Sequence, residues 1–216
     1  MKKINIFICV ANEDLAYAKE LERIFSNCYG FQVFLYDKSI IPSDDFQIEI
    51  IENLKSCEIF VPLVSASLKK SAFCNQEIGF AVSRNYKIFP ISIDDTEPYG
   101  LIDHVKRLKY DPTEIFGLLK AATDFFHNVM CHENFINFKE RSINGLVEAL
   151  KESPNTLTTT GIVYMFEMTV DEITLSEKHI KDILWSMKNN QSIFDAGEYY
   201  DRLKRFMKKK YSKSID

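Results

Sequence analysis

Apolar segments alternate with amphipathic segments through nearly the first half of the chain. Four apolar runs rich in Ile, Val and Phe are typical of strands buried on both faces of a sheet: residues 4–11, 31–36, 58–64 and 86–93. Between them, apolar residues recur at helical spacing, as at Ala18, Leu21 and Phe25. This alternation predicts an α/β fold built on a parallel sheet.

Helical patterns dominate beyond residue 95. We expect a short helix, a fifth strand and two longer helices, within residues 101–110, 114–130 and 142–150. Ser153-Pro154 and the threonine-rich run at 156–160 mark a boundary, and two amphipathic helices with a basic end follow it. The sequence therefore predicts one domain at residues 1–153 and a C-terminal helical extension at residues 154–216.

Candidate binding residues gather where the predicted strands end. Ligands of parallel sheets bind beyond the carboxyl ends of the strands. The loops after the first three predicted strands converge there and bring together Ala11, Asn12, Asp37 and Ser65. The helix predicted at 71–84 begins at the same edge, so Phe73 and Glu77 in its first turns face the crevice.

Glu77 stands among apolar neighbours on that helix. Phe73 lies one turn before it, and Phe80 and Ala81 lie one turn after it. A carboxylate beside apolar surface is poorly hydrated, which raises the cost of its charge and strengthens its attraction for a nearby cation. Two interpretations remain open: a surface acid at the rim that pairs with Arg84, or a functional carboxylate.

The net charge of −4 gives no attraction to nucleic acid or to an anionic membrane, so neither is an expected partner. The basic C-terminal end either attracts a phosphate-rich partner or is a solvated helix end. No segment approaches the roughly 20 apolar residues that span a bilayer. The five cysteines lack a Cys-x-x-Cys pair, as expected of a reducing compartment. These features predict a cytoplasmic protein.

Common cofactor motifs are missing from the sequence. Neither Gly-x-Gly-x-x-Gly nor Gly-x-x-x-x-Gly-Lys-Ser/Thr occurs, which disfavours a Rossmann dehydrogenase and a P-loop NTPase. Cys131, His132 and Glu133 carry groups that bind metals, but three adjacent side chains on a helix point in different directions. We expect no metal site.

Four blocks of sequence, in this order and spacing, resemble a bacterial TIR (Toll/interleukin-1 receptor) domain: residues 6–14, 33–37, 64–81 and 88–91. The most specific part is Ser-Ala-Phe-Cys-Asn-Gln-Glu-Ile-Gly-Phe-Ala, which begins at Ser71. The resemblance covers about residues 4–110. It implies a flavodoxin-like TIR domain with a central parallel sheet of about five strands.

The resemblance also implies roles for individual residues. Enzymatic TIR domains cleave the nicotinamide–ribose bond of NAD+ with a glutamate that corresponds to Glu77. Phe73 corresponds to the aromatic residue that lines the pocket, where Trp is common, and residues 38–45 correspond to the loop that covers the site and mediates TIR–TIR contacts. The chain departs from many bacterial members at Cys9-Val10, where Ser-His or Ser-Tyr is frequent, and at Pro42-Ser43, where Gly is frequent.

The activity implied is that of an NAD+ glycohydrolase or ADP-ribosyl cyclase, with NAD+ as substrate and no cofactor. It would serve bacterial antiphage defence by depleting NAD+ or by making a nucleotide signal for a downstream effector, and other TIR domains are expected partners. Because nicotinamide in NAD+ is already positively charged, it leaves without a general acid. One carboxylate is then enough to stabilise the oxocarbenium-like transition state. Attack by water and attack by a group of the same nucleotide both remain open.

Three alternatives remain. The first is a TIR domain that only assembles with other TIR domains. The second is an enzyme resembling nucleoside deoxyribosyltransferases, which also place a glutamate near a ribose. The third is a response-regulator receiver phosphorylated on Asp37, which is disfavoured because the first loop offers only Glu13 and Asp14, beyond a break.

Overall fold

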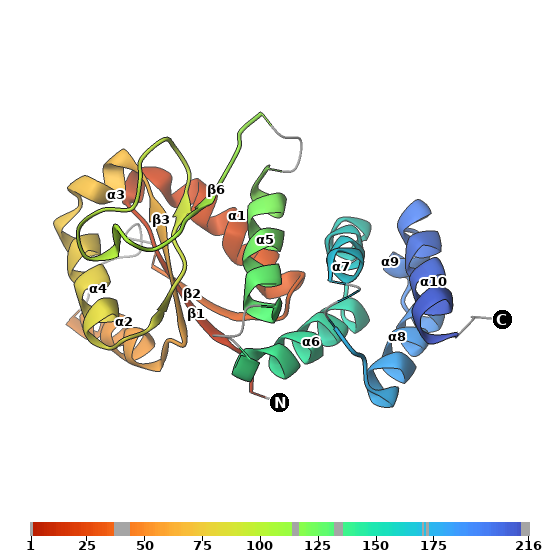
Figure 1. Cartoon of the computed structure of the whole chain (residues 1–216). Coiled ribbons are helices and arrows are strands. Elements are labelled where there is room, and N and C mark those ends of the chain that lie inside the picture. The colour runs from red at the N-terminus through yellow and green to blue at the C-terminus, as the bar shows by residue number, and fades with distance from the viewer. Residues whose placement is uncertain are drawn as a thin grey trace. The chain divides into compact units, whose positions relative to one another are not determined.

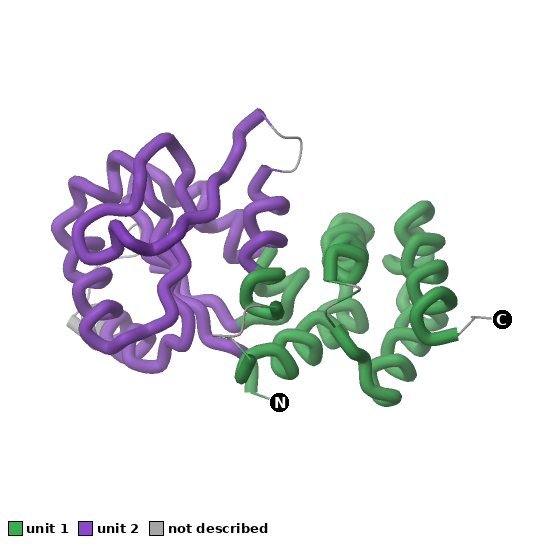
Figure 2. Tube along the Cα trace, in the orientation of Figure 1, with its two compact units in different colours: residues 1–3, 24–31, 126–216 green, residues 4–23, 32–125 purple. Residues whose placement is uncertain are grey.

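The computed structural model describes residues 2–36, 44–113, 117–131, 136–169, 171 and 173–212, except for the side chains of residues 44–47. It divides into two compact units (Figure 2). Unit 2 consists of Ile4–Arg23 and Gln32–Phe125, and unit 1 consists of Met1–Lys3, Ile24–Phe31 and Phe126–Asp216. The predicted domain boundary after residue 153 lies inside unit 1 and stays a prediction.

A parallel sheet forms the centre of unit 2 (Figure 1). Its strands are β1 (Asn5–Cys9), β2 (Gln32–Leu35), β3 (Ile59–Val64), β4 (Lys87–Ile88), β5 (Ile91–Ser92) and β6 (Leu108–Lys109). The order is β2-β1-β3-β5-β6, with β4 also paired to β3. The strand order therefore reverses at β1, and the crevice between the ends of β1 and β3 is where flavodoxin-like sheets bind ligands. The predicted flavodoxin-like sheet is confirmed.

The fourth predicted strand, residues 86–93, is divided into β4 and β5. Both pieces pair with β3 in one continuous register, Phe60 opposite Ile88 and Leu63 opposite Ile91. Pro90 lies between the pieces and has no backbone N–H to donate. The prediction of one unbroken strand was wrong for this reason.

Helices cover both faces of the sheet (Figure 1). One face carries α2 (Asp44–Ser56), α3 (Ala66–Lys70) and α4 (Ala72–Ser83), and the other carries α1 (Leu15–Asn27) and α5 (Gly117–Cys131). Two short 3-10 helices, η1 (Asn12–Asp14) and η2 (Gly100–Ile102), lie in loops. Between the sheet and α2–α4, the core includes Phe7 and Phe60, whose stacked rings have centroids 5.6 Å apart.

Helix α3 occupies residues that the sequence pattern predicted as a loop. It forms because the Ser65 hydroxyl accepts a hydrogen bond from the Leu68 N–H at 2.9 Å, while the Leu68 side chain is fully buried. Ser71 then ends α3 and begins α4, since its hydroxyl accepts from the Cys74 N–H at 3.3 Å. The sequence pattern predicted a loop and one helix after β3, whereas the structure has two helices there.

The described part of unit 1 is helical, with α6 (Ile136–Lys151), α7 (Thr156–Met168), α8 (Glu177–Asn189), α9 (Gln191–Phe194) and α10 (Glu198–Tyr211). Helices α8 and α10 confirm the two amphipathic helices predicted there. The threonine-rich run at the expected boundary instead starts α7, where Asn155 caps the Thr158 N–H at 2.9 Å and Thr159 is buried. Among the described helices, none has both the length and the apolarity needed to cross a membrane.

Candidate functional site

Glu77 lies in the middle of α4 and is 6% exposed. Its neighbours Cys74, Ile78 and Ala81 on the same helix are also buried. Arg84, by contrast, is exposed, and its guanidinium carbon lies 5.3 Å from the centre of the Phe80 ring. The interpretation of Glu77 as a surface acid at the rim is therefore wrong.

Two thiol contacts hold α4 against the carboxyl end of β1. The Cys9 thiol donates to the Cys74 carbonyl oxygen at 3.8 Å, and the Cys74 thiol donates to the Val10 carbonyl oxygen at 3.4 Å. The two sulfur atoms and a carboxylate oxygen of Glu77 all lie within 4.8 Å of one another. The predicted catalytic carboxylate is thus located at the end of β1, beside the point where the strand order reverses.

Burial governs the electrostatics around this carboxylate. It raises the pKa of the Cys9 thiol well above its ordinary value, and the neighbouring Cys74 and Glu77 raise it further. Burial also raises the pKa of Tyr99 to about 12, with contributions from Cys9 and Cys74. The Tyr99 hydroxyl oxygen is buried and has no hydrogen-bond partner within the part of the chain that the structure describes. Glu77 therefore stands in a poorly hydrated place, beside two buried thiols.

Phe73, which the sequence predicts to line a substrate pocket, packs beside an aromatic residue that follows β2. It is half-buried, one turn before Glu77, and its ring centroid lies 6.1 Å from that of Tyr36, the residue after β2. The two rings join the start of α4 to the carboxyl end of β2. They lie on the same side of the sheet as Phe34 and Phe80, packed against the core that contains Cys9 and Cys74.

Ser65 lies at the carboxyl end of β3 and is 2% exposed. Its hydroxyl donates to an Asp14 carboxylate oxygen at 2.6 Å while it accepts from Leu68. Burial raises the pKa of Asp14, and the hydrogen bond from Ser65 opposes that rise. Asp94 accepts the neighbouring Ala66 N–H at 2.9 Å. Ser65 therefore organises the loops at this edge.

The remaining predicted binding residues differ in their surroundings. Ala11 is buried after β1, whereas Asn12 is exposed and begins η1. Asp37 and residues 38–43 lie outside the described residues.

The sequence pattern did not predict that Cys9, Cys74 and Tyr99 belong to this site. One signal was available for Cys74. It is three residues before Glu77 on one helix, and this spacing places both side chains on the same face.

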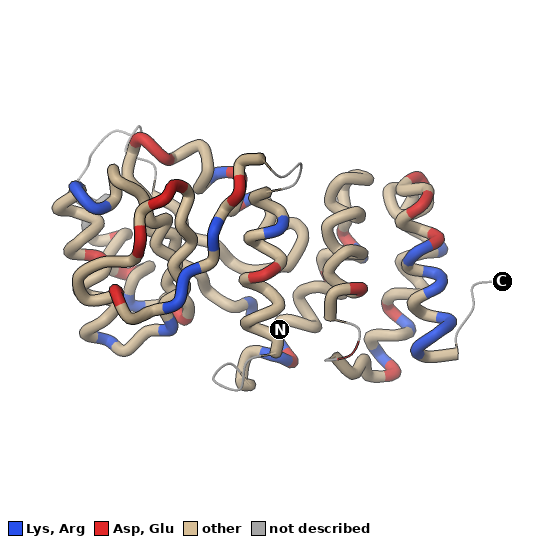
Figure 3. Tube along the Cα trace, turned by 45° about the horizontal axis from the view of Figure 1, so that its top comes forward, with Lys and Arg blue, Asp and Glu red and all other residues tan. Residues whose placement is uncertain are grey.

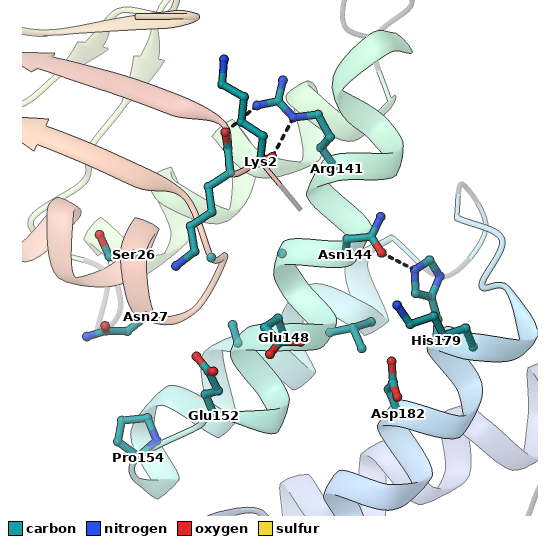
Figure 4. A pocket seen from close by; sticks show the side chains of 16 residues that line it. Lys2, Ser26, Asn27, Arg141, Asn144, Glu148, Glu152, Pro154, His179 and Asp182 are labelled. Carbon is teal, nitrogen blue, oxygen red and sulfur yellow. Dashed lines mark hydrogen bonds between the residues drawn. The ribbon is translucent and has the colours of Figure 1, made fainter. Parts of the chain in front are cut away.

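A separate cavity of about 840 Å³ lies within unit 1 (Figure 4). Its lining carries charges of both signs, including Lys2, Arg141, Glu148 and Asp182. The His179 ring nitrogen Nε2 lies 2.8 Å from the Asn144 side-chain oxygen, and burial lowers the pKa of His179. Of the predicted substrate-binding residues that the structure describes, none lines this cavity.

Basic side chains follow helix α10 toward its end (Figure 3). Glu198 and Asp201 stand in its first turn and Lys208, Lys209 and Lys210 in its last turn. This distribution complements the helix dipole. It supports the interpretation of the basic end as a solvated helix terminus.

Comparison with known proteins finds a matching family and similar solved structures. A family model described as TIR domain matches residues 6–115 of the chain. The crystal structure of the TIR domain of the Toll-related Receptor TRR-2 from the lower metazoan Hydra magnipapillata is similar at a TM-score of 0.42 and 19% identity, covering 48% of this chain and 82% of that chain. No curated protein matches the chain.

Proposed function

The chain belongs to the TIR domain family, and we propose that it is an enzyme that cleaves the nicotinamide–ribose bond of NAD+ with Glu77 as the catalytic carboxylate. TIR domains in general associate with one another, and some of them are NADases. The observation that carries the proposal is the 6% exposure of Glu77 at the carboxyl end of β1. A carboxylate buried at the ligand-binding edge of a sheet is a candidate functional group.

The chemistry needs one carboxylate. The bond between ribose C1′ and the nicotinamide nitrogen breaks, and its electron pair leaves with neutral nicotinamide. Positive charge then develops on the ribose, where Glu77 stabilises it more strongly than water would because the site is poorly hydrated. Addition of water to C1′ with loss of a proton gives ADP-ribose, whereas addition of a nitrogen or hydroxyl of the same nucleotide gives a cyclic isomer.

Neighbouring residues supply the walls in this proposal. Phe73, which is half-buried beside Tyr36, contacts the nicotinamide and ribose. Ala11 and Asn12 after β1, Asp37 after β2 and Ser65 after β3 contact the rest of the nucleotide. Ser65 also holds Asp14 in place, because its hydroxyl donates a hydrogen bond to the Asp14 carboxylate.

Burial of Glu77 sets a condition on activity. A ribose reaches a carboxylate that is 6% exposed only when the side chains around it separate. Association with a second TIR domain is one way to separate them, and we therefore propose that the active form is an assembly. The biological role that we propose is bacterial antiphage defence in the cytoplasm, either through NAD+ depletion or through a nucleotide signal read by an effector.

The test is release of nicotinamide from NAD+, followed by chromatography at high protein concentration with a crowding agent. We expect Glu77→Ala and Glu77→Gln to abolish release. Glu49→Gln is the matched control, because Glu49 is an exposed glutamate on α2. Mass spectrometry of the second product distinguishes ADP-ribose from a cyclic isomer.

Equal activity in the wild type and Glu77→Ala, or no activity in either, would contradict the proposal. Inactivity combined with binding to other TIR domains favours the assembly-only alternative. Exchange of free bases on deoxynucleosides without NAD+ favours the deoxyribosyltransferase-like alternative.

A further inference from the structure

We propose that Cys9, Cys74 and Glu77 form a binding site for a thiophilic divalent cation of the Zn2+ class. The ligand atoms of these three residues lie within 4.8 Å of one another, and all three side chains are buried. This proposal differs from the expectation of no metal site, which rested on Cys131, His132 and Glu133. Cys9 and Cys74 are 65 residues apart in the sequence and meet through the packing of α4 on β1.

The geometry needs only small adjustments to hold such an ion. Zn2+ binds thiolate sulfur at about 2.3 Å and carboxylate oxygen at about 2.0–2.2 Å, so tetrahedral ligand atoms lie roughly 3.5–3.8 Å apart. The separations of up to 4.8 Å in the chain close by about 1 Å through side-chain rotation. Both thiol hydrogen bonds end on backbone carbonyl oxygens, and their loss is offset by two metal–sulfur bonds.

The donor set selects the class of cation. Two thiolates with one carboxylate favour Zn2+ over Mg2+ and Ca2+, which take oxygen ligands. Three protein ligands leave a fourth position for water. None of the five cysteines is in a disulfide, so Cys9 and Cys74 keep their sulfur available for coordination.

The proposed binding depends on pH. Each thiol gives up its proton when it binds a metal ion, so binding to Cys9 and Cys74 becomes stronger as pH rises.

Tyr99 is a second, independent indication. Its buried hydroxyl has no hydrogen-bond partner among the described residues, and Tyr99 packs against the core cluster that contains Cys9 and Cys74. A buried hydroxyl without a partner is rare in native proteins. Water in the fourth coordination position would give this hydroxyl the partner that it lacks.

The consequence for catalysis rests on the proposed function. Glu77 bound to a metal ion is no longer available to the ribose, so the metal-loaded chain would not cleave NAD+. Metal binding itself does not depend on that activity, and it is measured without NAD+.

The experiment is a titration of the full chain with Co2+ in the presence of a phosphine reductant. Tetrahedral Co2+ bound to thiolates shows intense visible bands and a sulfur-to-cobalt charge-transfer band in the near ultraviolet. We expect one Co2+ per chain, displaced by Zn2+ with loss of these bands. Cys9→Ser and Cys74→Ser should each lose about half of the charge-transfer intensity, and Glu77→Gln should keep that intensity but bind Co2+ more weakly.

Cys57→Ser is the matched control, because Cys57 is a buried cysteine of the same unit whose thiol donates to the Ile59 carbonyl oxygen at 3.1 Å. Circular dichroism verifies that each variant is folded. A measurement on the wild type avoids variants altogether: Zn2+ should protect Cys9 and Cys74, but not Cys131, from alkylation mapped by mass spectrometry. The inference is overturned if no charge-transfer band forms, if both Cys9→Ser and Cys74→Ser keep the full intensity of the wild type, or if Cys57→Ser loses as much intensity as they do.

Discussion

The Cys74 sulfur lies 3.4 Å from the Val10 carbonyl oxygen, and this contact fixes the first turn of α4 to the residue that follows β1. The contact matters because Glu77 is one turn further along the same helix. The Cys74 thiol therefore helps to hold the carboxylate in its position relative to the sheet.

Phe73→Ala should lower kcat/KM for NAD+ about tenfold, as expected when roughly 1 kcal/mol or more of aromatic contact is lost. Phe73→Trp should retain activity, because a larger ring still forms the wall. Phe80→Ala is the matched control, since Phe80 is a half-buried ring one turn beyond Glu77 that packs on Tyr86 at 6.3 Å. An equal loss in both alanine variants would show that Phe73 has no special place at the site.

Glu77→Gln should lower the pKa of Cys9, because the carboxylate that repels the thiolate is gone. Burial, the largest cause of the raised pKa of Cys9, is unchanged in the variant, so the pKa should stay above its ordinary value. The thiolate is the reactive form, and Cys9 should therefore be alkylated faster in the variant than in the wild type at the same alkaline pH. Mass spectrometry measures each thiol separately, and Cys57, with a pKa raised to about 12 mainly by burial, serves as the internal control. Unchanged alkylation of Cys9 would refute the electrostatic coupling.

Ser65→Ala should reduce the free energy of unfolding by about 1–2 kcal/mol, because it removes the cap of α3 and leaves Asp14 without its hydrogen bond. Ser67→Ala, within the same helix, should have a much smaller effect. Urea unfolding monitored by circular dichroism gives both values.

The same variant should change the dependence of stability on pH. The pKa of Asp14 is raised in the folded chain, and losing the Ser65 hydrogen bond raises it further. A carboxyl whose folded pKa is raised favours folding while protonated, so its contribution is lost as pH rises from the ordinary carboxyl pKa through the folded pKa. Ser65→Ala should therefore lose more stability than the wild type across this acidic window, and parallel curves would contradict the assignment.

Gly145→Ala should destabilise unit 1 by about 1–3 kcal/mol, because a methyl group there would lie 2.8 Å from the Tyr29 carbonyl oxygen. Gly79→Ala is the opposite case. Nothing lies within 4 Å of a methyl group at Gly79 in α4, and removing a helical glycine should stabilise the chain by about 0.5–1 kcal/mol. Thermal unfolding compares the stability of the two variants. A gain in stability in Gly145→Ala would contradict the close approach of Gly145 to the Tyr29 carbonyl oxygen.

The sequence pattern predicted the sheet well because buried parallel strands are continuous apolar runs, such as the fully buried β3. It failed where local chemistry overrides such patterns. Pro90 divides a strand that is apolar throughout. Helix α3 is only five residues long, too short for helical periodicity to be visible, and it depends on the single cap at Ser65.

The sequence pattern indicates where Glu77 and Phe73 lie in the fold, but it does not indicate that Cys9 and Cys74 lie beside them. Strand order places Glu77 and Phe73 near one edge, and that much follows from alternation of strands and helices. The approach of Cys9 to Cys74 depends on how closely α4 packs on β1, which no local pattern encodes. The threonine-rich run at 156–160 resembles a linker in composition, yet burial of Thr159 in α7 makes it part of a core.

Ser71 joins helices α3 and α4. Its N–H donates to the Leu68 carbonyl oxygen at 3.0 Å at the end of α3, and its hydroxyl accepts a hydrogen bond from the Cys74 N–H in the first turn of α4. Because Ser71 ends one helix and caps the next, no loop separates α3 from α4. We therefore expect a displacement of Ser65 to be transmitted through both helices to Glu77.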